Sequence, residues 1–372
     1  MSVTVLVDPD HAGHHFQAVA NVAAVARRQG PVVLLTSVGA TATPNYEAFL
    51  ADVDIEVREV FSATFVPTEE LLAQVVAACD AGDVSTVVMM DADQALKRWW
   101  RLAPKAFRGR RRPRVVFMLT RYPARAKVTD KWLWKLKVPK ALLVAVSRAG
   151  RSVDHVAGFA GRDDTSTGWL VKRTRDPDIC LASAQDRAEI RARHGLPADR
   201  VIVGMFGVLS DRRNIPLVWE ALEAAGLDAD LLLAGKQDDT VRAWVAATAA
   251  AHPGRLHVFD DFLPNLLIDE LVAASDVAPI PLTNNGPSGI MGKAIAAGVP
   301  VVTAGSVVRE KEVLASGCGE VAELSAESLG AAIRRVVEHE GVWESRIPPA
   351  TAEEFARDLL GVDADGRVRT AR

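Results

Sequence analysis

The sequence predicts an α/β fold with two domains, each built on a parallel sheet covered by helices on both faces. Short apolar runs recur along the chain without alternating polar residues, which is typical of strands buried on both faces of a parallel sheet. Helical patterns separate these runs. At 372 residues the chain is too long for one ordinary hydrophobic core, so two domains are expected.

The first half begins with an alternation of strands and helices. Strands are expected over residues 4–7, 31–36, 86–90, 114–119 and 141–146, with one helix ending near residue 29 and another over residues 69–81. The polar, glycine-rich segment 158–177 has no clear period and is the expected crossing between domains. The first domain is therefore expected over residues 1–176.

The second half has the same kind of alternation. Strands are expected over residues 201–206, 231–234, 256–259, 277–282 and 299–303, and helices over residues 183–193, 216–225, 240–251, 265–274 and 288–297. The second domain is therefore expected over residues 177–345. Residues 346–372 form a tail with a helix over 352–360, which can pack back on either domain; we expect the N-terminal one.

The composition excludes several classes of protein. No run of 18 or more apolar residues is present, so no transmembrane helix is expected. The start, MSVTVLVDPD, lacks the basic residues and apolar core of a signal peptide. Cys79, Cys180 and Cys318 are far apart and lack metal-ligand spacing, which fits a reducing compartment. These features predict a cytoplasmic protein.

One stretch of the second half has the features of an anion site. Ser288 follows the loop after strand 277–282 and is placed to cap a helix, because its hydroxyl can accept a free amide of the first turn. Gly289 leaves that turn bare, and the free N–H groups and helix dipole favour an anion. Such loops at the carboxyl ends of strands bind ligands in α/β folds. An ordinary buried strand–loop–helix explains the same pattern.

A second loop is a candidate for the same ligand. Gly207 follows strand 201–206, and Arg212 and Arg213 come shortly after it. Arginine binds phosphate bidentately, so this loop suits a diphosphate, although a solvated loop is the alternative. The two loops together favour a phosphorylated ligand.

Five segments of the second half carry a family resemblance. They are RARHGLPADRVIVGMFGVLSDRRN (191–214), LLLAGK (231–236), RLHVFDDFLPNLLIDELVAASDVAPIPL (255–282), SGIMGKAIAAGVPVVTAG (288–305) and GSVVREKEVLASGCG (305–319). In this order they resemble the donor-binding domain of GT-B glycosyltransferases, particularly the retaining family 4. The resemblance implies two Rossmann-like domains whose parallel sheets face each other across a cleft. The resemblance implies a nucleoside-diphosphate sugar as co-substrate, with UDP or GDP as its nucleotide. It also implies an acceptor bound by the first domain, retention at the anomeric carbon, and no cofactor or metal.

The residues at the family's functional positions partly depart from its pattern. The family carries an arginine directly after the first-loop glycine and a cation five residues later; here these are Val208, which departs, and Arg213, which fits. Its two glutamates at the sugar and the ribose align with Asn285 and Lys293. Asn285 still bonds hydroxyls, whereas Lys293 only donates, so we expect Lys293 to contact a phosphate or to change how the nucleotide sits. Glu312 matches a further acidic position near the nucleotide.

The neighbours of these residues complete the predicted donor site. Asn284 and Gly286 flank Asn285 and are assigned to the sugar and nucleotide. The start at Ser288 and Gly289 resembles a GT-B branch in which helix amides hold the diphosphate without the glutamates.

In the first half, Gly13, His14 and His15 resemble the glycine-rich helix start that lies across the cleft from the donor. The resemblance assigns Gly13 to the diphosphate and implies a catalytic histidine there or at the end of a later strand, where this chain has Asp91. His14 is the candidate relay for the acceptor proton, because a histidine titrates near neutral pH. An N-cap region with exposed histidines is the alternative.

Two further features of the first half concern ligands. Arg121 and Tyr122 end strand 114–119 and are expected to line the acceptor side. The sequence Asp91-Ala92-Asp93 also matches the metal-binding DxD of the GT-A fold, but a three-residue match is common by chance and that fold has no second domain of this kind.

The segment from Lys97 to Lys140 is strongly basic. It holds 16 of the 44 Lys and Arg residues but one acidic residue, Asp130, and four of the eight tryptophans: Trp99, Trp100, Trp132 and Trp134. Such composition is typical of segments that lie on anionic lipid, so Trp132 and Trp134 are assigned to the acceptor or to the inner face of the plasma membrane. An anionic soluble acceptor, nucleic acid and a protein partner are the alternatives, and no nucleic-acid motif is present.

The sequence therefore predicts a metal-independent glycosyltransferase of the hexosyl type, with His14, Asp91 and Asn285 as catalytic candidates. The loss of both family glutamates leaves a non-catalytic GT-B partner of another transferase as an alternative. A sugar-nucleotide epimerase, which shares the fold, is a third hypothesis.

Overall fold

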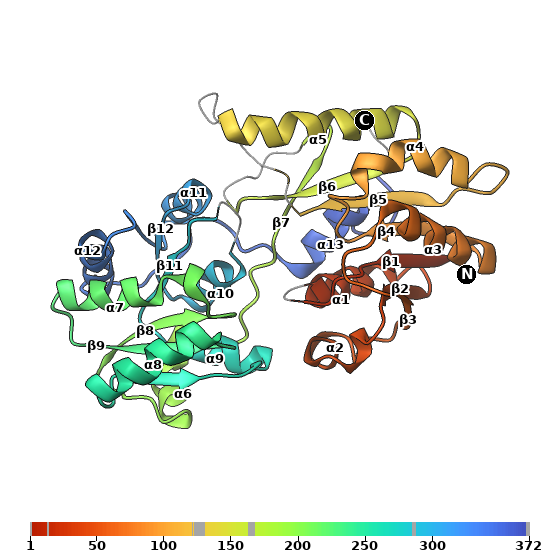
Figure 1. The fold of residues 1–372 in the computed structure, drawn as a ribbon. Helices are drawn as coiled ribbons and strands as arrows, with labels where there is room; N and C mark the ends of the chain where they lie inside the picture. Colours follow the sequence, from red (N-terminus) through yellow and green to blue (C-terminus); the bar gives the residue numbers. More distant parts are fainter. Residues whose placement is uncertain are drawn as a thin grey trace. The chain divides into compact units, whose positions relative to one another are not determined.

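The computed structural model of the protein describes residues 2–12, 15–120, 122, 131–162, 168–284 and 288–369. The chain divides into two compact units (Figure 1). The first unit contains Met1–Ala160, Asp164–Asp176 and Ala350–Arg372, and the second contains Gly161–Asp163 and Pro177–Pro349. Each unit is a parallel sheet between two layers of helices, as the sequence predicts.

The sheet of the first unit has seven parallel strands in the order β3-β2-β1-β4-β5-β6-β7. Val5 of the inner strand β1 pairs with Val33 of β2 on one side and with Val87 of β4 on the other. The strands are β1 (Val3–Val7), β2 (Val32–Ser37), β3 (Glu56–Phe61), β4 (Val84–Met89), β5 (Arg114–Leu119), β6 (His155–Ala160) and β7 (Lys172–Arg175).

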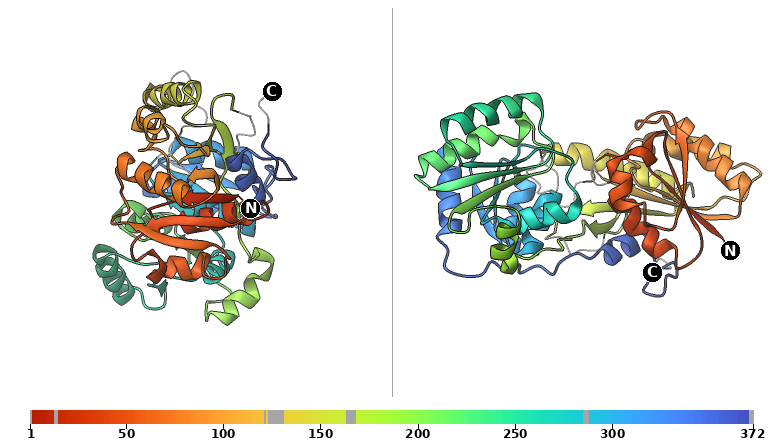
Figure 2. Two further views of the ribbon diagram at one scale, coloured as in Figure 1. Left: turned by 90° about the vertical axis from the view of Figure 1, so that its right-hand side faces the viewer. Right: turned by 90° about the horizontal axis from the view of Figure 1, so that it is seen from below.

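Helices cover both faces of this sheet (Figure 2). Val5 and Val7 belong to the core under α3, α4 and α5, while Leu6 between them belongs to the core under α1, α2 and α13, because successive strand side chains point to opposite faces. The helices are α1 (His15–Ala26), α2 (Pro44–Phe49), α3 (Thr68–Ala81), α4 (Leu96–Ala106), α5 (Lys131–Ala149) and α13 (Ala352–Leu360), with a 3₁₀ turn η1 (Ala40–Ala42).

Helix α13 returns the end of the chain to the first unit. Phe355 stacks on Phe159 of β6 with ring centroids 5.9 Å apart. His155 Nε2 lies 2.9 Å from the carbonyl oxygen of Asp358, to which it donates. Burial lowers the pKa of His155 to about 4, so the ring that holds α13 is neutral.

One prediction for the first unit was wrong: residues 141–146, expected as a strand, form part of helix α5. The segment 158–177, expected as a crossing with no clear period, also supplies the last three residues of β6 and all of β7. A short apolar run does not distinguish a buried strand from a helix, and α5 buries Val144 while exposing Leu142 and Val146. β7 is polar because it is the edge strand, where polar side chains are tolerated.

The second unit contains two three-stranded parallel sheets, β10-β9-β8 and β11-β12-β13. A parallel bridge between Val203 and Val277 joins β8 to the chain entering β11, so the strands follow the order β10-β9-β8-β11-β12-β13. The strands are β8 (Val201–Phe206), β9 (Ala229–Ala234), β10 (Leu256–Phe259), β11 (Ala278–Pro281), β12 (Val301–Ala304) and β13 (Gly319–Ala322).

Two helix layers also cover the sheets of the second unit. One core includes Leu271 of α9 and Met291 of α10, and the other includes Val218 of α7 and Leu329 of α12. The helices are α6 (Arg187–Arg193), α7 (Ile215–Ala224), α8 (Asp239–Ala251), α9 (Asn265–Ala274), α10 (Gly289–Ala297), α11 (Val307–Ser316) and α12 (Ala326–Val337), with 3₁₀ turns η2 (Ala184–Asp186) and η3 (Asp211–Arg213).

Among the described helices, none has the length and apolar character needed to cross a bilayer.

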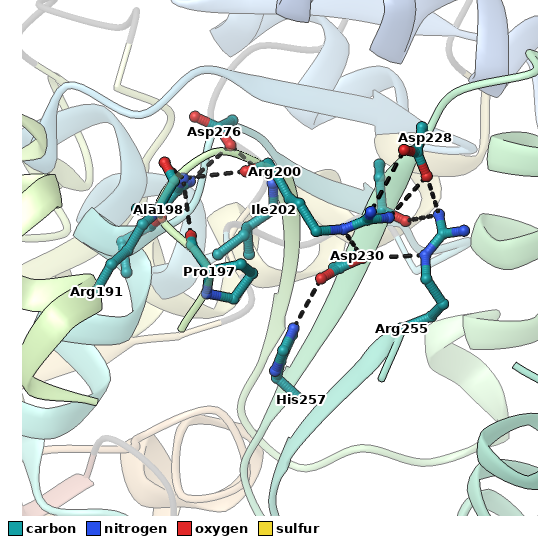
Figure 3. A network of polar contacts seen from close by, with 12 residues as sticks. Arg191, Pro197, Ala198, Arg200, Ile202, Asp228, Asp230, Arg255, His257 and Asp276 are labelled. Atoms are coloured by element: carbon teal, nitrogen blue, oxygen red, sulfur yellow. Dashed lines mark hydrogen bonds and ion pairs between the residues drawn. The ribbon is translucent and has the colours of Figure 1, made fainter. Parts of the chain in front are cut away.

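A network of charges joins the amino ends of β8, β9 and β10 (Figure 3). Asp230 of β9 is fully buried and accepts from Arg200 Nε at 2.7 Å, from Arg255 Nε at 3.0 Å and from His257 Nε2 at 2.9 Å. Asp228 pairs with the same two arginines, but its side chain is 76% exposed. The network thus offers a buried and an exposed carboxylate with shared partners.

Replacing Asp230 with Asn should destabilise the second unit by about 3 kcal/mol, because it removes a buried carboxylate that accepts from Arg200, Arg255 and His257. Asp228→Asn, the matched control, should cost much less, because solvent screens that carboxylate. Hydrogen exchange of the β9 and β10 amides measures the effect within this unit. Equal effects of the two substitutions would show that the burial of Asp230 does not increase its contribution to stability.

Candidate functional site

The strand order indicates at which edge of each sheet a ligand is expected to bind. In the second unit the order reverses direction between β8 and β11, and in the first between β1 and β4. Open α/β sheets bind ligands beyond the carboxyl ends of the strands at such a switch point. The loops after β8 and β11 therefore define the candidate donor site.

The loop after β8 approaches the end of β9 closely. The Gly207 amide donates to Ala234 at 2.9 Å, and Gly207 has a φ of 87°, which favours glycine. Leu209 fixes the next turn by donating to Lys236 at 2.9 Å. This backbone path carries the chain directly into the arginine pair.

The two arginines of this loop have different environments. Arg213 is partly buried and its Nε donates to the Val208 carbonyl at 3.1 Å, whereas Arg212 is exposed. Burial, with a contribution from the neighbouring charge of Arg212, lowers the pKa of Arg213 to about 10. Arg213 therefore stays cationic at neutral pH while being partly shielded from water, which strengthens its attraction for an anion.

Helix α10 begins at the carboxyl end of β11, as predicted. Ser288 is buried, and its Oγ accepts the Met291 amide at 3.3 Å as an N-cap. This cap uses one amide of the first turn, and the helix geometry leaves the others for a ligand. Gly289 is the first helical residue. The assigned residues Asn285 and Gly286 lie outside the described residues.

The start of the loop before α10 is held from two sides. Asn214 Nδ2 donates to the carbonyl of Pro281 at 2.6 Å. Arg309 of α11 donates to the next carbonyl, that of Leu282, and to Asn284 Oδ1 at 3.3 Å. Sequence reasoning missed Arg309, although Ser306 and the three residues after it form an N-cap pattern directly after β12.

Lys293 lies inside the second unit. It is buried, its Nζ pairs with Asp269 of α9, and it also donates to the Ile179 carbonyl at 3.2 Å. The other oxygen of Asp269 accepts the Leu181 amide at 2.9 Å. The ammonium thus ties α10 to α9 and to the 179–181 segment, and its charge is balanced there.

Glu312 is also engaged internally. Its carboxylate accepts from the Arg162 amide at 3.2 Å and from Arg162 Nη1 at 3.0 Å. Arg162 pairs with Asp178 as well and donates to the Ser288 carbonyl at 3.3 Å. This buried arginine comes from the segment that sequence reasoning read as a domain crossing, where the sequence gives no signal for it.

The switch point of the first unit carries a carboxylate–imidazole cluster. Asp8 directly follows β1 and is fully buried, and its carboxylate lies 3.0 Å from Nδ1 of His15, the first residue of α1. His15 Nε2 lies 3.6 Å from Asp10. Hydrogen bonding and charge from Asp8, with Asp10 and Asp91, outweigh desolvation and raise the pKa of His15 to about 9. Burial raises the pKa of Asp8.

The remaining first-unit residues are placed separately. Asp91 accepts the Asp93 amide at 3.1 Å, whereas Asp93 pairs with Lys140 and accepts Thr120 Oγ1 at 2.9 Å. Among the described residues no group of three or more His, Cys, Asp or Glu is arranged to hold a metal. Gly13, His14 and Arg121 lie outside the described residues.

Tyr122 and Trp134 share one cation. Lys137 Nζ lies 5.8 Å from the centroid of each ring, which is cation–π range. Burial raises the pKa of Tyr122. Trp134 is 39% exposed on α5, and the side chain of Trp132 lies outside the described part of that helix.

Solved structures resemble nearly the whole chain, although no protein-family model and no curated protein sequence matches it. HepE from Anabaena in complex with UDP matches with a TM-score of 0.63 and 17% identity, over 96% of this chain and 93% of that chain. Sucrose-phosphate synthase from Thermosynechococcus elongatus matches with a TM-score of 0.61 and 16% identity, over 96% and 93%. The chain has the GT-B fold.

The same fold serves more than one activity among its neighbours. UDP-GlcNAc 2-epimerase from Methanocaldococcus jannaschii matches with a TM-score of 0.58 and 10% identity, over 96% of this chain and 98% of that chain. At these identities the likeness establishes the GT-B fold, and the activity has to be argued from the site.

The imidazole of His15 should titrate near pH 9, well above its ordinary pKa of 6.5. Because the folded-state pKa is raised, its stabilisation is fully present below pH 6.5 and is lost as pH rises through about 9. That contribution amounts to about 3 kcal/mol at most. NMR titration of the histidine ring protons, assigned with His15→Gln, measures the pKa.

Thermal unfolding of the first unit provides the second readout. His15→Gln should be less stable than the parent at pH 6, and the difference should shrink by pH 10. Asp10→Asn is the control, because Asp10 is farther from the ring and more exposed. A His15 that titrates at or below 6.5 would contradict the proposed ion pair.

Proposed function

We propose that this GT-B protein is a glycosyltransferase that transfers a sugar from a nucleoside-diphosphate donor, with UDP or GDP as the nucleotide, to an acceptor bound by the first unit. The observation that carries the proposal is the convergence of the Arg213 loop and the N-terminus of α10 at the switch point between β8 and β11. It is supported by neighbours of the same fold that were solved with UDP and with UDP-glucose.

The chemistry follows from charge. Transfer of the sugar leaves a growing negative charge on the departing diphosphate, and preorganised donors aimed at that charge lower the barrier. In this proposal Arg212 and Arg213 supply the cations, Gly207 and Gly13 allow close backbone approach, and the amides after Ser288, beside Gly289, face the phosphates.

The sugar and the nucleotide are assigned to the adjoining loop. Asn284, Asn285 and Gly286 would contact the sugar and nucleotide, with Asn285 at the reacting centre. Because Lys293 and Glu312 are bound by Asp269 and Arg162, we propose that they position α10 and α11 behind the phosphates. Retention and independence from metal remain part of the proposal, which rests here on the family resemblance.

The first unit would supply the acceptor side. His14 and Asp91 are the proposed catalytic residues, and Arg121 and Tyr122 the proposed acceptor contacts. Asp91 follows β4 and lies near the Asp8–His15 pair. Its charge therefore acts on both groups. Three acidic side chains around one imidazolium give this edge the capacity to accept a proton from a hydroxyl.

Isothermal titration with UDP, GDP, dTDP and ADP tests donor binding. Arg213→Ala should raise the Kd for the preferred diphosphate about 10- to 100-fold, because it removes a charge-assisted contact of about 1.5–3 kcal/mol. Arg242→Ala, which removes an exposed arginine of the same unit, should leave the Kd unchanged. Failure to bind any nucleoside diphosphate, or an Arg213→Ala variant equal to the parent, would overturn the proposal.

Product analysis with the matching sugar nucleotide separates the alternatives. Slow release of the sugar to water or an acceptor supports a transferase and argues against a non-catalytic partner. Conversion of the donor sugar without an acceptor would instead identify an epimerase, a reaction known for a neighbour of this fold.

We further propose that helix α5 attaches the protein to an anionic membrane surface on the cytoplasmic side, where a lipid-linked or anionic acceptor would be found. Trp134, Val138, Leu142 and Val146 recur every four residues, and their exposed fractions are 39%, 54%, 64% and 40%. At helical spacing they form one apolar stripe. Exposed Lys131 and Lys135 lie on the same helix.

The neighbouring helix α4 extends this surface. Lys97, Arg101 and Lys105 are exposed there, together with Trp100. An apolar stripe bordered by lysines and arginines suits the interface of an anionic bilayer, in which apolar side chains enter the acyl boundary while cations meet the headgroups.

Flotation with phosphatidylserine-containing vesicles should recover the parent protein at low salt, and recovery should fall as salt rises because screening weakens the attraction. Trp134→Ala/Leu142→Ala should reduce recovery several-fold. Trp169→Ala is the matched control, because Trp169 is 92% exposed but lies outside this surface. Binding that ignores lipid charge, or equal losses in both variants, would refute membrane attachment through α5.

A further inference from the structure

Arg309 occupies an unusual position for a charged residue. It lies in the first turn of α11, where Ser306 Oγ caps its amide at 3.5 Å, and its side chain is fully buried. Helix α11 starts at the carboxyl end of β12, the strand next to β11. The arginine therefore enters the same edge of the sheet as the proposed donor site.

Arg309 and the segment that carries Arg213 both bind the chain at the end of β11. Arg309 binds the carbonyl of Leu282 and the side chain of Asn284, while Asn214, the residue after Arg213, binds the carbonyl of Pro281. Pro281 and Leu282 are consecutive. Arg213 and Arg309, about a hundred residues apart in sequence, therefore lie on segments that bind adjacent residues at the switch point.

The charge of Arg213 acts on Arg309. Burial lowers the pKa of Arg309 to about 10, and the charge of Arg213 contributes to the lowering, while Glu312 and Glu310 act against it. Glu312 is shared, because two donors of Arg162 bind its carboxylate. Keeping two guanidinium groups near each other in a site of low dielectric costs free energy, which an anion between them would offset.

The loop after β8 lacks a cation at the position where Arg309 could supply one. Position 208, directly after the loop glycine, holds a valine that is 60% exposed, so this part of the loop presents no cation. Arg309 approaches from the opposite side of the switch point, from α11, and can supply the charge that Val208 does not.

We propose that Arg309 is a second phosphate-binding residue of the donor site, whose guanidinium and that of Arg213 face the same diphosphate, while its contacts with Leu282 and Asn284 hold the loop that leads into α10. The inference rests on the proposed function, since it names a residue of the same site. It assigns a ligand class to a buried arginine that sequence reasoning did not select.

The test compares ligands that differ only in phosphate. Arg309→Gln should raise the Kd for UDP about 10- to 100-fold while the much weaker binding of uridine changes less than about twofold, because the nucleoside lacks the diphosphate. Arg309→Lys, which keeps the charge but loses the planar fork, should recover part of the UDP affinity. Inorganic pyrophosphate should compete with UDP for the parent and much less for Arg309→Gln.

A purely structural role gives different results. Loss of UDP and uridine binding together, or an Arg309→Lys variant no better than Arg309→Gln, would overturn the inference. Arg191→Gln is the matched control: Arg191 is a buried arginine of the same unit that binds carbonyls and Asp276 at the opposite edge of the sheet. It should lower thermal stability and leave the UDP affinity of the folded protein unchanged.

Failure of this inference can be distinguished from failure of the proposed function. A parent protein that binds no nucleoside diphosphate overturns both. A parent that binds UDP, loses affinity in Arg213→Ala and keeps it in Arg309→Gln overturns the role of Arg309 alone. If both arginines face one diphosphate, the double variant should also weaken UDP binding by a factor that differs from the product of the two single effects.

Discussion

The parallel contact between β8 and the start of β11 is the constraint on which the second unit depends. The Gly204 amide donates to Val277 at 2.9 Å, and the Asp276 amide donates to Ile202 at 2.8 Å. A Cβ at Gly204 would clash with the Ser275 hydroxyl and the Phe206 ring, so a larger residue here would force these side chains to move. The contact reverses the strand order, and α7 and α10, which follow β8 and β11, pack in different cores. Such a switch point is where open α/β sheets bind ligands.

Charge around this switch point is divided between groups with internal partners and groups that face outward. Lys293 and Glu312, at positions where the resembling family has acids near the nucleotide, are each satisfied within the unit by Asp269 and Arg162. Both pairs are almost fully buried, and removal of one partner would leave a costly isolated charge. They therefore fix α10 and α11 in place. In the proposed donor site, the described groups that remain to contact a donor are therefore cations and amides, whereas the resembling family binds the ribose with a carboxylate.

Sequence reasoning anticipated the elements with strong local patterns and missed those set by distant partners. Strand 201–206, helix 265–274 and the Ser288 cap agree with the structure because capping and apolar period are local properties. Residues 141–146 were misassigned because an apolar run of six fits either element. The roles of Lys293 and Arg162 depend on partners 24 and 150 residues away, which no local pattern reveals.

The switch point of the first unit has a different charge from that of the second unit. Its switch point gathers Asp8, Asp10 and Asp91 around His15, where the second unit gathers arginines. With a pKa of about 9, His15 is already protonated at neutral pH, so it cannot serve there as the base that takes a proton from an acceptor hydroxyl. Its charge instead opposes the rise in the pKa of Asp8 that burial causes. If the first unit binds the acceptor as we propose, proton acceptance falls to a carboxylate such as Asp91 or to His14, with His15 as the positive charge that allows several carboxylates to coexist.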